Sequence, residues 1–169
     1  MRHKMKSGFA LLAAMLLLAW SLGGCIADDN DKNDNDDPGD PVASLLLTSG
    51  QTSGIDGERL TALRKQAAYN QLWQEHETAF VTPPAQPAVD FNQHMVVATF
   101  LGRRDTDGYR VEVVEVRERE HSLMVTVRFT VPDDGCQVTE ISTQPYRLIT
   151  IPQTDKVVGF TTEVRESCP

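Results

Sequence analysis

The chain has 169 residues, of which 40% are hydrophobic and 24% are charged, and its formal net charge is −8 at pH 7. Proteins that bind a nucleic-acid backbone need a basic face, so this acidic balance argues against a nucleic-acid partner. The length allows one ordinary hydrophobic core and no more.

The first 24 residues have the three zones of a secretory signal peptide. Arg2, Lys4 and Lys6 form a basic start, and an unbroken apolar run extends from Phe9 to Trp20. A helix of that length reaches under about 20 Å, whereas a bilayer core is about 30 Å thick. A membrane-spanning helix is therefore the weaker interpretation, and we expect the segment to be removed after export.

A lipoprotein processing motif follows at once. The residues Leu22-Gly23-Gly24-Cys25 match the lipobox of bacterial lipoproteins, with leucine at −3, small residues before the cut and cysteine after it. All four positions agree, so we predict a lipid on Cys25 and a membrane anchor, with a chance cysteine as the alternative. Ile26 replaces the Asp that retains lipoproteins in the inner membrane of enteric-type cells. The outer membrane, facing the periplasm or the cell surface, is therefore favoured if the organism has one.

An acidic stretch separates the lipobox from the rest of the chain. Residues 25–41 hold seven Asp against Lys32, and Asp28 to Asp40 contains no apolar residue. Such a segment cannot bury surface to offset its ordering entropy, so we predict a disordered, self-repelling tether. Its Asp and Asn alternate as in calcium loops, but the EF-hand glycine at position six and glutamate at twelve are missing.

Residues 42–169 are predicted to form a single β-rich domain. Val42 to Leu47 is a short apolar run before a turn-rich stretch, which indicates a strand and a loop. Within residues 58–77 the period becomes helical, and one face carries Tyr69, Leu72, Trp73 and His76. The helix start stays open between residues 58 and 66, because residues 58–64 could equally pair as a strand.

Several short strands follow a proline-rich extended connection. Residues 95–101 are almost continuously apolar, which predicts burial on both faces. Residues 109–116 alternate with a slip of one residue, as at a β-bulge, and residues 123–131 alternate cleanly. Segments 146–151 and 157–162 complete the set. We predict a mainly β (α+β) fold: an antiparallel sheet, or a small barrel or sandwich, with one packed helix.

This strand order brings two loops together. If consecutive strands alternate in direction, the loop 102–108 and the loop 132–144 share one end of the domain. The turns near residues 118–121 and 152–156 then lie at the other end.

Two cysteines remain besides Cys25. In an oxidising compartment, Cys136 and Cys168 most simply form a disulfide. Closing a loop of about 33 residues should stabilise the fold by roughly 3–4 kcal/mol. A thiol nucleophile or a pair of metal ligands is the alternative, but no His or second C-x-x-C accompanies them.

Enzyme signatures are missing from the sequence. His76, His94 and His121 are the only histidines of the predicted mature chain, and none belongs to a metal, nucleophile-elbow or phosphate-loop motif. No pairing of a nucleophile with a base is visible. We therefore predict a protein that is not an enzyme and that uses no cofactor or metal.

The loop 102–109 is the strongest candidate for contacting another protein. Its residues Asp107-Gly108 are a favoured hairpin-turn pair. Two adjacent arginines and an aromatic residue at a loop base are good contact material. The alternative is a solubilising hairpin with its tyrosine in the core. Together with the start of a later strand, the predicted partner-binding residues are Arg103, Arg104, Thr106, Asp107, Gly108, Tyr109, Pro145 and Tyr146.

Five short motifs resemble those of the PrcB C-terminal domain, a module named after an accessory lipoprotein subunit of a surface protease complex. In chain order they are Trp73, Val89-Asp90-Phe91, Met95-Val96-Val97, Phe100-Leu101-Gly102-x-Arg104-x-Thr106-x-Gly108-Tyr109 and Thr143-x-Pro145-Tyr146. The resemblance spans roughly residues 45–163. One position departs from it, because Asp107 replaces the first glycine of the family's T-G-G-Y.

The resemblance implies a compact β-rich domain with one helix, and it favours dividing residues 58–77 into a strand and a helix. It also implies a non-catalytic lipoprotein that supports or regulates an envelope or surface protease. No catalytic residues accompany the family pattern.

Two other functions stay open. The first is a protease inhibitor that inserts the 102–109 and 143–146 loops side by side into an active-site cleft, by analogy with chagasin-like inhibitors. The second is a small-ligand or metal-binding envelope module.

Overall fold

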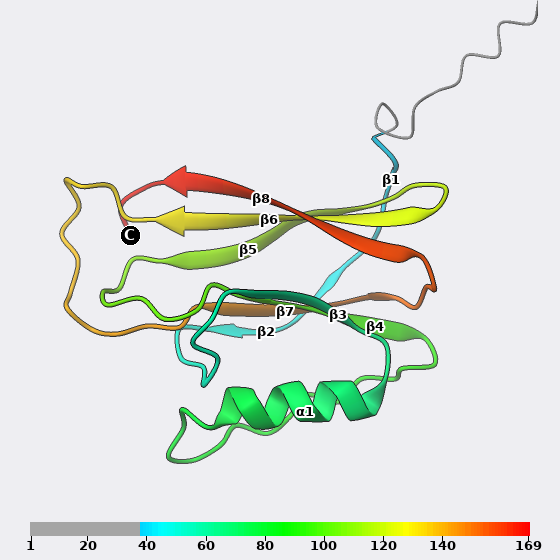
Figure 1. Cartoon of the computed structure of the whole chain (residues 1–169), viewed down its shortest axis with the longest axis horizontal. Coiled ribbons are helices and arrows are strands. Elements are labelled where there is room, and N and C mark those ends of the chain that lie inside the picture. The colour runs from blue at the N-terminus through cyan, green and yellow to red at the C-terminus, as the bar shows by residue number, and fades with distance from the viewer. Residues whose placement is uncertain (1–37) are drawn as a thin grey trace, which may run out of the picture. The chain divides into compact units, whose positions relative to one another are not determined.

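The computed structural model describes residues 38–169, so the predicted signal peptide, Cys25 and tether residues 25–37 lie outside the described residues. Residues 38–41, which the sequence assigned to the disordered tether, are described, and two of them form a strand. Eight strands and one helix follow one another along the described chain (Figure 1). In order they are β1 (Asp40–Pro41), β2 (Leu45–Gly50), β3 (Arg59–Leu63), α1 (Gln66–Glu77), β4 (His94–Phe100), β5 (Arg110–Glu118), β6 (Ser122–Val131), β7 (Tyr146–Pro152) and β8 (Val157–Glu166).

The strands form two four-stranded sheets that stack as a sandwich (Figure 1). The first sheet has the order β1-β5-β6-β8, and the second has the order β2-β7-β4-β3. Apolar side chains from facing strands fill the space between the sheets; they include Met95, Val97, Ile149, Ile151, Val111, Leu123, Val125, Val127 and Phe129. The predicted mainly β fold with one helix is confirmed, as an open sandwich.

The helix α1 covers the outer face of the second sheet and creates a second core. Its predicted apolar face is buried, and that face packs with residues of β4 and β7. Every residue of β4 after His94 is buried, which confirms the prediction from its continuous apolar run. The segment 58–77 divides into β3 and α1, as the family resemblance implied.

The first sheet confirms two finer predictions. The β5–β6 register shifts between Val113 and Glu115, where the sequence predicts a bulge. Buried and less buried residues alternate along β6 as far as Phe129, whereas Thr130 is also buried and Val131 is half-buried. The first predicted strand lies later than expected, because Val42 donates its N–H to Val116 O at 2.8 Å beside β5 and β2 begins only at Leu45.

Two expectations about strand neighbours are wrong. β8 runs parallel to β6, from Ser122–Val157 to Val131–Glu166. β4 and β5 lie in different sheets, so residues 102–108 connect two layers and do not close a hairpin. The reason is that both sides of β4 are already occupied, by β3 and β7. Alternation shows which face of a strand is buried, but not which strand lies beside it.

Candidate docking rim

Two loops that are distant in sequence lie together at one end of the sandwich (Figure 1). Residues 102–109 connect β4 to β5, and residues 132–145 connect β6 to β7; we call this pair of loops the rim. Arg104 and Thr143 exchange two backbone hydrogen bonds, of 2.8 and 2.9 Å. The opposite end holds the turns after β5 and β7, where Lys156 Nζ donates to Arg119 O at 2.7 Å. The prediction that the two loops lie at one end of the domain and the two turns at the other is confirmed.

Asp107 joins the two loops through both its backbone and its side chain. Its N–H donates to Thr139 O at 3.1 Å, and its Oδ1 accepts from the Thr139 N–H at 2.8 Å. The residue at which this chain departs from the family motif therefore supplies a contact that glycine cannot make. The next residue, Gly108, has φ +90° and lies close to Pro132, so glycine is required there.

A disulfide ties the same loop to the C-terminus. Cys136 and Cys168 are bonded with a Cα–Cα distance of 5.2 Å, which is the pairing that the sequence predicts. The Ser167 N–H also donates to Val131 O at 3.0 Å, which extends the β6–β8 pairing to the bond. The long loop is therefore held to the end of β8 as well as to residues 102–109.

The adjacent arginines of the rim have different surroundings. Arg104 is half-buried; its Nη2 donates to Leu101 O at 3.0 Å, and its guanidinium carbon lies 5.6 Å from the Tyr109 ring centroid. That side chain holds the loop in shape, and Tyr109 packs against the main core. Arg103 is exposed and is the member of the pair that another protein can reach.

Two predicted contact residues lie inside the domain. Pro145 is buried, and the Tyr146 side chain, 7% exposed, belongs to the core beneath α1. The Tyr146 ring centroid lies 4.4 Å from that of His76 and 6.0 Å from that of Phe100. Tyr146 therefore packs the helix onto the second sheet. The remaining predicted residues Thr106, Asp107 and Gly108 are half-buried between the two loops.

The sequence predicts that the 132–144 loop lies at the rim, but the predicted contact residues include none of its exposed residues. Residues 133–142 are exposed apart from Cys136, and they include Val138 (37% exposed) and Ile141 (58% exposed). The signal that could have found them is the isolated position of two aliphatic residues in a polar loop that begins Asp133-Asp134-Gly135. Burial of the neighbouring Pro145 and Tyr146 leaves this stretch as the main outer surface of the loop.

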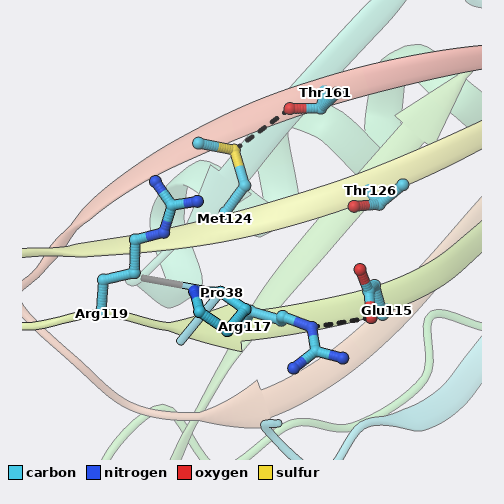
Figure 2. A pocket seen from close by; sticks show the side chains of 7 residues that line it. All are labelled: Pro38, Glu115, Arg117, Arg119, Met124, Thr126 and Thr161. Carbon is cyan, nitrogen blue, oxygen red and sulfur yellow. Dashed lines mark hydrogen bonds and ion pairs between the residues drawn. The ribbon is translucent and has the colours of Figure 1, made fainter. Parts of the chain in front are cut away.

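A separate hollow of about 400 Å³ lies on the outer face of the first sheet (Figure 2). It is lined by Pro38, Glu115, Arg117, Arg119, Met124, Thr126 and Thr161. The Arg117 Nε donates to Glu115 at 2.9 Å, and the Thr161 hydroxyl donates to Met124 Sδ at 3.4 Å (Figure 2). The one carboxylate of the lining, Glu115, is thus already paired with Arg117.

The buried histidine has a structural environment. His76 is 1% exposed, and its Nδ1 lies 3.0 Å from the Ser53 hydroxyl oxygen. Burial lowers its pKa to about 4, so the imidazole is neutral at physiological pH. It is enclosed by aromatic rings, and within residues 38–169 no three His, Cys, Asp or Glu side chains are grouped so as to hold a metal ion.

The part of the chain that the structure describes holds no helix long and apolar enough to cross a membrane.

Comparison with known proteins supports the family resemblance. Residues 95–152 match the protein family described as PrcB C-terminal, a stretch that extends from β4 to the end of β7. It includes both loops of the rim. No curated protein and no solved structure matches the chain.

Proposed function

We propose, from the match of residues 95–152 to the PrcB C-terminal family, that this chain is a non-catalytic lipoprotein of the cell envelope that binds a secreted or surface protease and stabilises or regulates it. The family supports an accessory role in a protease complex. The lipobox at Leu22 to Cys25 supports the envelope location.

The observation that carries this proposal is the construction of the rim. Its two loops are joined by the Arg104–Thr143 and Asp107–Thr139 hydrogen bonds, and the Cys136–Cys168 disulfide ties the longer loop to the C-terminus. Most of residues 133–142 nevertheless remain exposed. A loop that is both exposed and fixed loses little conformational entropy on binding. This combination suits a docking surface.

The point at which the chain enters the folded domain supports the same function. β1 pairs with the end of β5, with Asp40 opposite Glu118, and the Arg117 Nη1 donates to Gly39 O at 3.1 Å. The rim adjoins the other end of β5, before Arg110 (Figure 1). A strand of this length extends about 30 Å. A force applied through the chain before Gly39 would therefore act at the end of β5 opposite the rim.

Co-purification of the intact lipoprotein tests the proposal. The full chain, extracted from membranes of the source cells in mild detergent after cross-linking, should bring with it a protease or a subunit of a protease complex, identified by mass spectrometry. A Cys25→Ala variant is the matched control, since it removes the predicted lipid and leaves the folded domain unchanged. Recovery of the chain without any envelope protein would contradict the proposal.

Inhibition of the protease is the second candidate, and the exposed, fixed stretch 137–142 favours it. Insertion of residues 143–146 into a cleft, as first expected, disagrees with the burial of Pro145 and Tyr146. Titration of papain-like and subtilisin-like proteases with the intact chain separates the two functions. An inhibitor lowers their activity at micromolar concentration, whereas an accessory subunit leaves it unchanged or raises it.

A further inference from the structure

The long loop of the rim is unusual for a compact domain. Residues 132–145 form no strand or helix, and loops of this length are mostly functional or disordered. Here each part of the loop has a partner. Cys136 is bonded to Cys168, Thr139 to Asp107 and Thr143 to Arg104, and the Gln144 N–H donates to Gln51 O at 2.8 Å. The loop is therefore ordered by contacts along its whole length.

An exposed part of this loop also has a hydrogen bond within its own backbone. The Ile141 N–H donates to Thr139 O at 2.8 Å, so the chain turns tightly around Glu140. The Thr143 hydroxyl donates to Thr106 O at 2.9 Å just beyond the turn. Residues 137–142 thus form an exposed turn that is fixed to residues 106 and 107 through Thr139 and Thr143.

The side chains of the loop 132–145, which contains this turn, combine apolar surface with negative charge. Val138 and Ile141 are 37% and 58% exposed. The carboxylates of Asp133, Asp134 and Glu140 are exposed on the same loop, and none of them forms an ion pair with another residue in the range 38–169. An exposed aliphatic pair beside unpaired carboxylates fits a pocket that is apolar inside and basic around its border.

We propose that residues 137–142 are the element that enters the partner of this chain, and that the partner is a protein presenting an apolar pocket bordered by Lys or Arg side chains. This inference rests on the proposed function and identifies the contacting turn within the rim. The Cys136–Cys168 and Asp107–Thr139 contacts serve it by holding the turn in its bound form before binding.

The proposed apolar contact is tested by measuring how tightly the chain binds the protease that was recovered with it, once that protease has been purified. The double variant Val138→Ser/Ile141→Ser should weaken binding at least about tenfold, since buried apolar anchors dominate protein interfaces. The matched control is Val81→Ser/Val157→Ser, which removes exposed valines outside the rim and should leave binding unchanged. Equal affinity of the first variant and the natural chain would overturn the inference and leave the proposed function intact.

The proposed basic border of the pocket is tested by the rate of association and its dependence on salt. Replacing Asp133, Asp134 and Glu140 by Asn, Asn and Gln should slow association severalfold and reduce its dependence on salt, because exposed charges mainly steer encounter. An unchanged association rate and salt dependence would overturn the predicted basic border.

Variants at Asp107 test whether its hydrogen bond to Thr139 holds the turn in place before binding or whether Asp107 itself contacts the partner. Asp107→Gly should weaken binding severalfold and raise hydrogen exchange at the Thr139 amide, whereas Asp107→Asn, which keeps an acceptor oxygen, should restore both. Loss of binding with unchanged exchange would overturn the preorganising role. If the natural chain recovers no protease at all, the proposed function fails and this inference fails with it.

Discussion

The carboxylate of Asp107 accepts a 2.8 Å hydrogen bond from the backbone N–H of Thr139, across 32 positions of sequence. One loop of the rim thereby fixes the middle of the other. The contact depends on a side chain that the family motif lacks at this position, so it is a property of this chain.

Removing that carboxylate should affect stability modestly. Asp107→Gly is expected to lower the free energy of unfolding by no more than about 1 kcal/mol, since the lost hydrogen bond is exposed to water. Asp107→Asn should lower the free energy of unfolding by less, because it keeps an acceptor oxygen. Urea unfolding followed by circular dichroism measures both, and a Gly variant as stable as the natural chain would show that the bond contributes nothing to folding.

The disulfide should have a larger effect. Replacing Cys136 and Cys168 by Ser together is expected to lower the free energy of unfolding by about 3–4 kcal/mol, because the bond closes a loop of about 33 residues. Unfolding of the natural chain with and without a reducing agent is the matched comparison. A double variant that unfolds at the same urea concentration as the oxidised chain would contradict this expectation.

His76 should make stability depend on pH in the acid range. Burial holds its pKa at about 4 in the folded domain, below the ordinary value of 6.5, so the unfolded chain takes up a proton first as the pH falls. The stabilisation is complete above pH 6.5 and is lost progressively down to about pH 4, by up to about 3 kcal/mol. His76→Gln should flatten this part of the profile relative to the natural chain. Parallel profiles would show that His76 is not responsible.

Tyr146 distinguishes a core residue from a contact residue. Tyr146→Ala is expected to lower the free energy of unfolding by about 3–5 kcal/mol, because it leaves a cavity between α1 and β7. Tyr146→Phe should cost far less, since the hydroxyl makes only a long contact of 3.5 Å with Thr48. Arg103→Ala, at an exposed position, should change stability by less than about 0.5 kcal/mol. Thermal unfolding of the three variants ranks them.

Periodicity in the sequence predicted which side chains are buried. The helix face at Tyr69 and Trp73, the buried run in β4 and the bulge after Val113 all follow from local spacing, because spacing determines the face on which a side chain lies. The meeting of the two rim loops also followed, since the direction of successive strands places their connections at one end or the other.

Neighbours across space could not be predicted in the same way. The β6–β8 pairing is parallel because β8 returns from the other sheet, and no local pattern records that crossing. Tyr146 is a residue type that often anchors protein interfaces, but here it fills the space beneath α1. That position depends on where the helix packs on the sheet, which the local sequence does not record. The exposed turn at Val138 and Ile141 became recognisable only once the residues on either side of it were placed.

The pairing of β1 with the end of β5 has a mechanical consequence. If the rim were held and the chain before residue 39 were pulled, the domain would be stretched along the direction of its strands. The bonds of residues 39–42 to Arg117 and Val116 would then bear the load together, in shear, before any core strand is pulled. Tension applied through the chain that enters the domain would thus reach the sandwich by way of these bonds.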